Sequence, residues 1–115
     1  MLAMHGGNDL LAAPVQGVLV QEEYNRQGIQ FYEQGQLAEA LRVFGEAMNI
    51  TPNHTGLNLN FLQALLKHAA QSGGLGGYAE AARGSLKRLE KLTEQHRQYK
   101  RYQHLLGRFN AMNSA

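Results

Sequence analysis

The chain has 115 residues, of which 43% are hydrophobic and 17% are charged, and its net charge is +2. This length is enough for one domain with a single hydrophobic core. The chain contains no cysteine, which excludes disulfide bonds, thiolate metal sites and cysteine nucleophiles, and its longest apolar runs are too short to cross a membrane.

The charges are distributed unevenly along the chain. Residues 1–60 contain six acidic and two basic side chains, whereas residues 61–115 contain nine basic and three acidic ones. An asymmetry of this kind can steer a charged partner, although it does not determine a fold.

The N-terminal segment is rich in glycine, alanine and polar residues and has no sustained hydrophobic period. It lacks a basic region, carries Asp9 and is interrupted at Pro14 and Gly17, so we do not interpret it as a secretory signal. We expect a cytoplasmic protein with no membrane contact. The expected organisation is a flexible segment over residues 1–16, a helical domain over 17–110 and a frayed tail over 111–115.

Residues 21–54 carry the clearest pattern, which predicts two short amphipathic helices joined by a tight turn. Apolar or small residues recur with helical spacing in each half, at Tyr24, Gly28 and Phe31 and then at Leu37, Ala40, Leu41, Phe44, Ala47 and Met48. Gly35 stands where a left-handed residue would end the first helix. Thr51 and Pro52 end the second, because the residue before a proline is disfavoured in the α conformation.

With small residues at Gly28 and Ala40, aromatic residues at Phe31 and Phe44, and Pro52 at the end, this stretch resembles a tetratricopeptide repeat (TPR). Tyr24 stands where the family prefers tryptophan, and Gln27 where it prefers leucine. The resemblance implies an all-α fold of stacked helical hairpins that acts as a protein-binding scaffold.

The remainder predicts a divergent second hairpin and a final capping helix. A third helix over 56–71, with Asn53 or Thr55 as its N-cap, is followed by a glycine-rich loop over 71–77. A fourth helix opens at 78–81, seven residues later than a 34-residue repeat would place it, and a fifth covers 94–109. Stacked hairpins need such a cap because each one buries its apolar face only against its neighbours. About two and a half repeats are near the lower limit for independent stability. We therefore expect that the N-terminal segment contributes to the stack, that the chain associates with itself, or that it is the end of a longer array.

The TPR resemblance implies a concave groove for a protein or peptide partner. In that family the first helix of each hairpin lines the groove, and the corresponding residues are Asn25, Ile29, Tyr32, Glu33, Leu59, Gln63, Leu66 and Lys67. The best-known peptide clamp of the family holds a C-terminal carboxylate with lysine, arginine and asparagine. Because Ile29 and Leu59 interrupt that pattern, a free C-terminus is not the ligand that we expect.

No pattern in the chain indicates an enzyme, a cofactor site or a metal site. The five histidines lack the i, i+4 spacing of a helical zinc pair, and no nucleophile, base and orienting group converge. The glycine-rich loop lacks the lysine and hydroxyl residue of a phosphate-binding P-loop. We therefore interpret it as a connector.

The alternative function is nucleic-acid binding through a basic face on the last helix. This face consists of Arg97, Lys100, Arg101, His104 and Arg108. Tyr99 and Tyr102 fall on the apolar side of the helix, which favours packing over stacking on bases, so nucleic acid is the less expected partner.

Residues 22–109 also resemble, with lower specificity, the C-terminal TPR region of bacterial response regulators. That resemblance implies a signalling module whose phosphoacceptor lies outside this chain. The preferred hypothesis is a non-catalytic protein-interaction module.

Overall fold

The computed structural model describes residues 20–113, and the regular secondary structure in that range is entirely helical. A first helix over residues 20–33 is followed by α2 (Leu37–Ile50), α3 (Thr55–Ser72), the short 3-10 helix η1 (Gly76–Tyr78), α4 (Ala79–Leu89) and α5 (Tyr99–Asn113). The predicted all-α class is confirmed for these residues. The flexible segment predicted over 1–16 lies outside the described residues.

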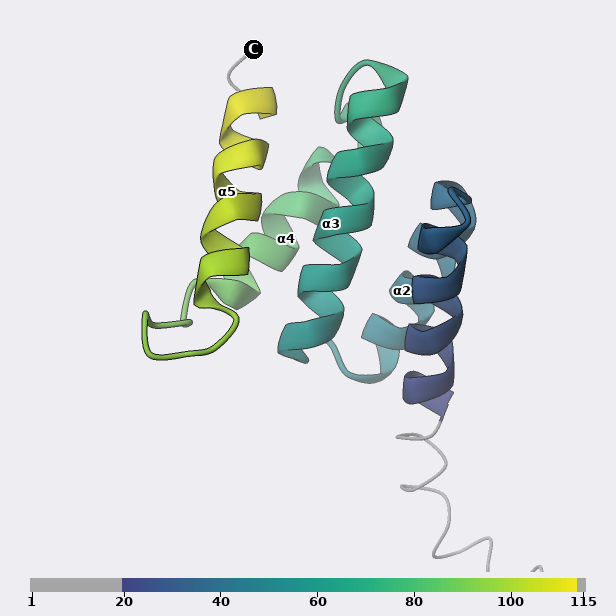
Figure 1. Ribbon diagram of the computed structural model, residues 1–115, viewed down its shortest axis with the longest axis horizontal. Coiled ribbons are helices and arrows are strands. Elements are labelled where there is room, and N and C mark those ends of the chain that lie inside the picture. The colour runs from purple at the N-terminus through teal and green to yellow at the C-terminus, as the bar shows by residue number, and fades with distance from the viewer. Residues whose placement is uncertain (1–19, 114–115) are drawn as a thin grey trace, which may run out of the picture.

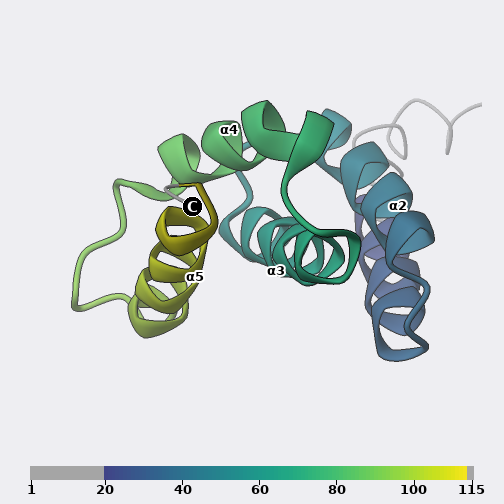
Figure 2. The same cartoon turned by 90° about the horizontal axis from the view of Figure 1, so that it is seen from above.

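The helices are arranged around α3. The first helix, α3 and α5 lie side by side in one row, and α2 and α4 lie behind them (Figure 1). Figure 2 shows the same two rows from above, with α3 between the N-terminal hairpin and α5. The buried core is continuous and includes side chains from α2, α3, α4 and α5. The hairpin and α5 are therefore the two ends of the stack.

The N-terminal hairpin forms where its glycines predict. Gly35 has a φ of +78°, and the amide of Gln36 donates to the carbonyl of Phe31 at 2.8 Å, which closes the turn between the two helices. Gly28 faces the ring of Phe44, and a Cβ atom at this position would lie 2.6 Å from Phe44 Cδ1. A glycine at position 28 thus lets the two helices of the hairpin approach closely.

The start of α3 differs in detail from the sequence-based expectation. Its N-cap is His54, whose Nδ1 accepts the amide hydrogen of Leu57 at 3.2 Å, and not Asn53 or Thr55. The side chain of Asn58 is 1% exposed and donates to the carbonyl oxygens of Pro52 and His54 at 2.8 and 2.9 Å. Its own oxygen accepts from Arg88 of α4 at 2.9 Å. One buried amide therefore joins the turn before α3 to α4.

The glycine-rich loop ends α3 as expected, and α4 follows with a buried face that is narrower than the predicted one. Gly73 caps α3 with a φ of +90°, and its amide donates to the carbonyl of Ala69. The helical spacing of the sequence over 78–92 predicts a buried stripe of Tyr78, Ala81, Ala82, Ser85, Leu86, Leu89 and Leu92. Tyr78 and Ala81 are instead exposed. The buried residues of α4 are Ala82, Ser85, Leu86 and Leu89.

The last helix lies further along the chain than predicted. Residues 94–98 form turns, in which the amide of Gln98 donates to Nδ1 of His96 at 3.0 Å. This local bond competes with the helical pattern, so α5 begins only at Tyr99. At its other end α5 continues to Asn113, which places residues 111–113 of the predicted frayed tail in a helix.

Candidate functional site

A pocket of about 270 Å³ opens on the face formed by the first helix, α3 and α5. The first helix contributes an apolar wall with one carboxylate, α3 contributes two amides, and α5 contributes one guanidinium. Phe44 of α2 also lines the pocket, although it is only 1% exposed. The full set of lining residues is Ile29, Tyr32, Glu33, Phe44, Asn60, Gln63 and Arg101.

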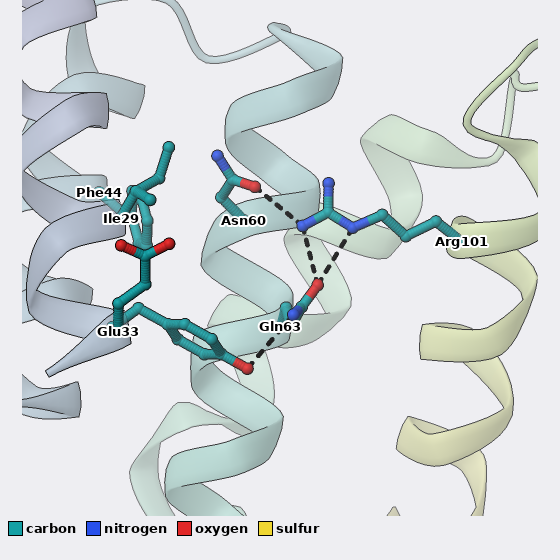
Figure 3. A pocket seen from close by; sticks show the side chains of 7 residues that line it. Ile29, Glu33, Phe44, Asn60, Gln63 and Arg101 are labelled. Carbon is teal, nitrogen blue, oxygen red and sulfur yellow. Dashed lines mark hydrogen bonds between the residues drawn. The ribbon is translucent and has the colours of Figure 1, made fainter. Parts of the chain in front are cut away.

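Arg101 organises the polar side of the pocket. Its guanidinium extends from α5 to α3, where it donates to the amide oxygen of Gln63 from Nε at 3.1 Å and from Nη2 at 2.8 Å, and to that of Asn60 from Nη2 at 2.8 Å (Figure 3). These bonds orient both amides, because their oxygens face the guanidinium and their nitrogens must point elsewhere.

Each of the two amides also donates a hydrogen bond to a side chain of the first helix. Asn60 donates to the side-chain oxygen of Asn25 at 2.9 Å, and Gln63 donates to the hydroxyl of Tyr32 at 3.2 Å. The five side chains therefore form a hydrogen-bonded network that crosses three helices. Since the hydroxyl of Tyr32 accepts from Gln63, its own hydrogen remains able to donate into the pocket.

No carboxylate among residues 20–113 neutralises the charge of Arg101. All of its described hydrogen bonds go to neutral amides, and its Nη1 donates no hydrogen bond to a described residue (Figure 3). Partial burial lowers the pKa of Arg101, while the nearby Tyr32 opposes this shift. Arginine nevertheless stays charged at neutral pH. Nη1 is therefore a cationic donor without a partner among the described residues.

Two further charged groups lie near this network. Glu33 extends from the first helix on the side of the pocket away from Arg101 (Figure 3). The ammonium of Lys67 lies 4.9 Å from the centre of the Tyr32 ring, which is a cation–π distance. The pocket thus has a positive side at α5 and a negative side at the first helix.

The structure brings together only part of the predicted groove. Ile29, Tyr32, Glu33 and Gln63 line the pocket, and Asn25 and Lys67 contact residues that line it. Leu59 and Leu66, which were also predicted to line the groove, are instead fully buried. Their side of α3 faces the core.

The position that we assigned to Leu59 is occupied by its neighbour Asn60. The expectation that the ligand is not a free C-terminus relied on Ile29 and Leu59, and the burial of Leu59 removes one of these two grounds. Three lining residues were not predicted as part of the groove, namely Phe44, Asn60 and Arg101. One signal was available for the last two, since Asn60 and Arg101 lie 41 residues apart, which is the 34-residue repeat plus the inferred seven-residue insertion.

The predicted basic face is not continuous. Arg97 lies in the turn before α5, and Arg101 points to α3. Lys100 and His104 are exposed and Arg108 is half-buried. Tyr102 is buried and Tyr99 is half-buried, so neither ring presents an open face for a base.

Other kinds of site are not seen in the described part of the chain. Between residues 20 and 113, no three histidine, aspartate or glutamate side chains come together as a possible metal site. In the same range, no helix combines the length and the apolar character needed to cross a membrane. A second, shallow pocket lies at the glycine-rich loop, where the rings of His68 and Tyr78 meet edge to face at 5.4 Å. His5 and Asp9 fall outside the described residues.

No family model, no characterised protein and no solved structure matches this chain. The geometry of the pocket is therefore the basis for the functional argument.

Proposed function

We propose that this chain is a non-catalytic protein-interaction module that binds a peptide segment carrying a carboxylate in the pocket between the first helix and α5. The pocket combines apolar area from Ile29 and Phe44 with a few fixed polar groups, a combination that orients a ligand. Its titratable groups are not arranged as a nucleophile with a base in hydrogen-bond reach.

The observation that carries this proposal is the guanidinium of Arg101. It is half-buried and fixed by two neutral amides, and its Nη1 has no described acceptor. A carboxylate is the natural partner, since charge-assisted hydrogen bonds to a guanidinium are stronger than neutral ones. Glu33 then favours a peptide N–H group or a basic side chain on the opposite side of the pocket.

The wider assignment is also part of the proposal. The alternating rows of helices and the close contact at Gly28 agree with a TPR-like scaffold of one regular and one divergent hairpin. As such a scaffold, the chain would serve as an output segment of a larger bacterial signalling protein.

Fluorescence anisotropy with two labelled peptide probes tests the proposed ligand. The first probe has internal aspartate and leucine residues and an amidated C-terminus, and the second has asparagine in place of aspartate and a free C-terminus. Binding of the first alone assigns a side-chain carboxylate, and binding of the second alone assigns a terminal one. Binding of neither probe would contradict the proposal.

A matched pair of variants tests the role of Arg101. Arg101→Gln is expected to weaken binding of the preferred probe by about tenfold to a hundredfold, the value of one charged hydrogen bond. Arg83→Gln removes the same charge from α4, where Arg83 is exposed and paired with Glu80, and should leave binding unchanged. Equal losses in both variants would indicate a nonspecific charge effect.

The alternative function is nucleic-acid binding through Lys100 and Arg108, since neither side chain forms an ion pair with a described residue. It predicts that affinity for a single-stranded oligonucleotide falls steeply with salt and falls further in Lys100→Gln/Arg108→Gln. Weak, salt-insensitive binding in the same titration would leave the peptide proposal preferred.

A further inference from the structure

The two ends of the stack carry opposite charges. On the N-terminal hairpin each basic side chain is already paired, Arg26 with Glu23 and Arg42 with Glu39. Three exposed carboxylates on the same hairpin form no ion pair with a described residue, namely Glu22, Glu33 and Glu46. The free charge of this end is therefore entirely negative.

The other end has the opposite character. Helix α5 contains no acidic residue, and it carries three basic ones, Lys100, Arg101 and Arg108. None of the three forms an ion pair with a described residue. The turn that precedes α5 adds two acidic and two basic residues over 90–98, so it does not cancel this charge.

Each end also exposes apolar area beside its charges. Val20 begins the first helix and Ile50 ends α2, so both lie at the open end of the antiparallel hairpin, where they are 42% and 39% exposed. On α5, Leu106 and Met112 are only partly buried against the core. Charge can therefore bring two such ends together, and apolar contact can hold them.

We propose that copies of this chain associate head to tail, with the open end of the hairpin in one copy docked on α5 of the next. The hairpin and α5, which carry the complementary charges, lie on opposite sides of α3 (Figure 1). Such a contact is heterologous, so each added copy leaves a free end and the assembly grows beyond a dimer. This inference does not require peptide binding, and the residues changed in its tests lie outside the pocket lining, which contains Glu33 and Arg101.

Sedimentation velocity over a concentration series provides the first test. At low salt, the average mass should rise past that of a dimer as concentration increases, and it should return to that of a monomer at high salt because screening weakens the contact. A monomer at every concentration would overturn the proposal. A dimer that does not grow would also overturn it, since this indicates a symmetric contact.

Two variants, each altered at one end, make the test specific. Glu22→Gln/Glu46→Gln removes charge from the hairpin, and Lys100→Gln/Arg108→Gln removes charge from α5. Each variant alone should associate at least tenfold more weakly than the unmodified chain. An equimolar mixture should form dimers that stop growing, because each mixed pair has one intact contact and no second one.

The matched control variants each remove two charges of one sign elsewhere. Glu39→Gln/Glu80→Gln removes two acids away from the open end of the hairpin, Lys87→Gln/Lys91→Gln removes two bases away from α5, and each should associate as the unmodified chain does. Circular dichroism establishes that every variant remains folded. Failure of the mixture to associate, or an equal loss in either control, would overturn the head-to-tail arrangement.

Discussion

Two helix junctions of the molecule are built in different ways. Within the hairpin, packing between the first helix and α2 is close and apolar, with the ring of Phe44 against the backbone of Gly28. Between α3 and α5, the pocket side is crossed by the guanidinium of Arg101 and two amides that reach solvent. The first junction depends on shape and the second on charge. Substitutions in the first should therefore lower stability, and substitutions in the second should chiefly change binding.

The largest expected effect comes from removing the ring at the apolar junction. Phe44→Ala should lower the free energy of unfolding by about 3–5 kcal/mol, because the side chain is 1% exposed and its loss leaves a cavity. Urea denaturation measures this change. Phe44→Leu, which fills part of the space, should cost clearly less. A loss below about 1 kcal/mol for the alanine variant would show that the hairpin collapses to fill the gap.

A methyl group added at the same junction should have the next largest effect. Gly28→Ala places a Cβ against the Phe44 ring and should cost about 1–3 kcal/mol by overpacking, although alanine favours helix. Gly45→Ala in α2 is the control, since a Cβ there meets nothing within 4 Å and should stabilise by about 0.5–1 kcal/mol. Effects of equal sign in the two variants would contradict the close approach at Gly28.

At the polar junction between α3 and α5, urea denaturation should show only a small change in the free energy of unfolding. Arg101→Gln should lower the free energy of unfolding by less than about 1.5 kcal/mol, because its bonds are to neutral amides and partly exposed. Hydrogen exchange of the α5 amides should rise more than that of the α2 amides. A loss as large as that of Phe44→Ala would mean that the network stabilises the fold more than the core does.

The smallest expected effect depends on pH. Burial raises the pKa of Tyr102, and the charges of Glu90 and Tyr99 add to the shift. The unfolded chain then loses the phenolic proton at lower pH than the folded one, so stability should fall as pH rises above about 10. Thermal unfolding measured at several pH values above about 10 gives the slope of stability against pH. In Tyr102→Phe the slope should be shallower, and an unchanged slope would assign it to other groups.

Much of the hairpin could be predicted from local rules. Gly35 and Pro52 each end the helix that precedes them, and the spacing of apolar residues in α2 predicts its buried face. The start of α5 could not be predicted in this way. The sequence continues a helical pattern through residues 94–98. The backbone amide of Gln98 instead donates a hydrogen bond to Nδ1 of His96, and this bond competes with the helix.

The pocket was predictable only in part. Ile29, Tyr32 and Glu33 follow from the first helix alone, because their register is fixed by Gly28 and Phe31. The register of α3 was wrong by one residue at Leu59, since α3 is buried over most of its surface and its apolar pattern does not mark a single exposed face. Arg101 reaches α3 from 38 residues away, and no local rule reports such a contact.

The contact between Gly28 and Phe44 has one more consequence, because Phe44 belongs both to the core and to the pocket. The ring of Phe44 occupies the space that a side chain at position 28 would fill, so a larger residue at 28 would have to move this wall of the pocket. A substitution at either position would change stability and ligand affinity together. Natural variation at these two positions should therefore be correlated, with an enlarged residue at 28 accompanied by a smaller one at 44.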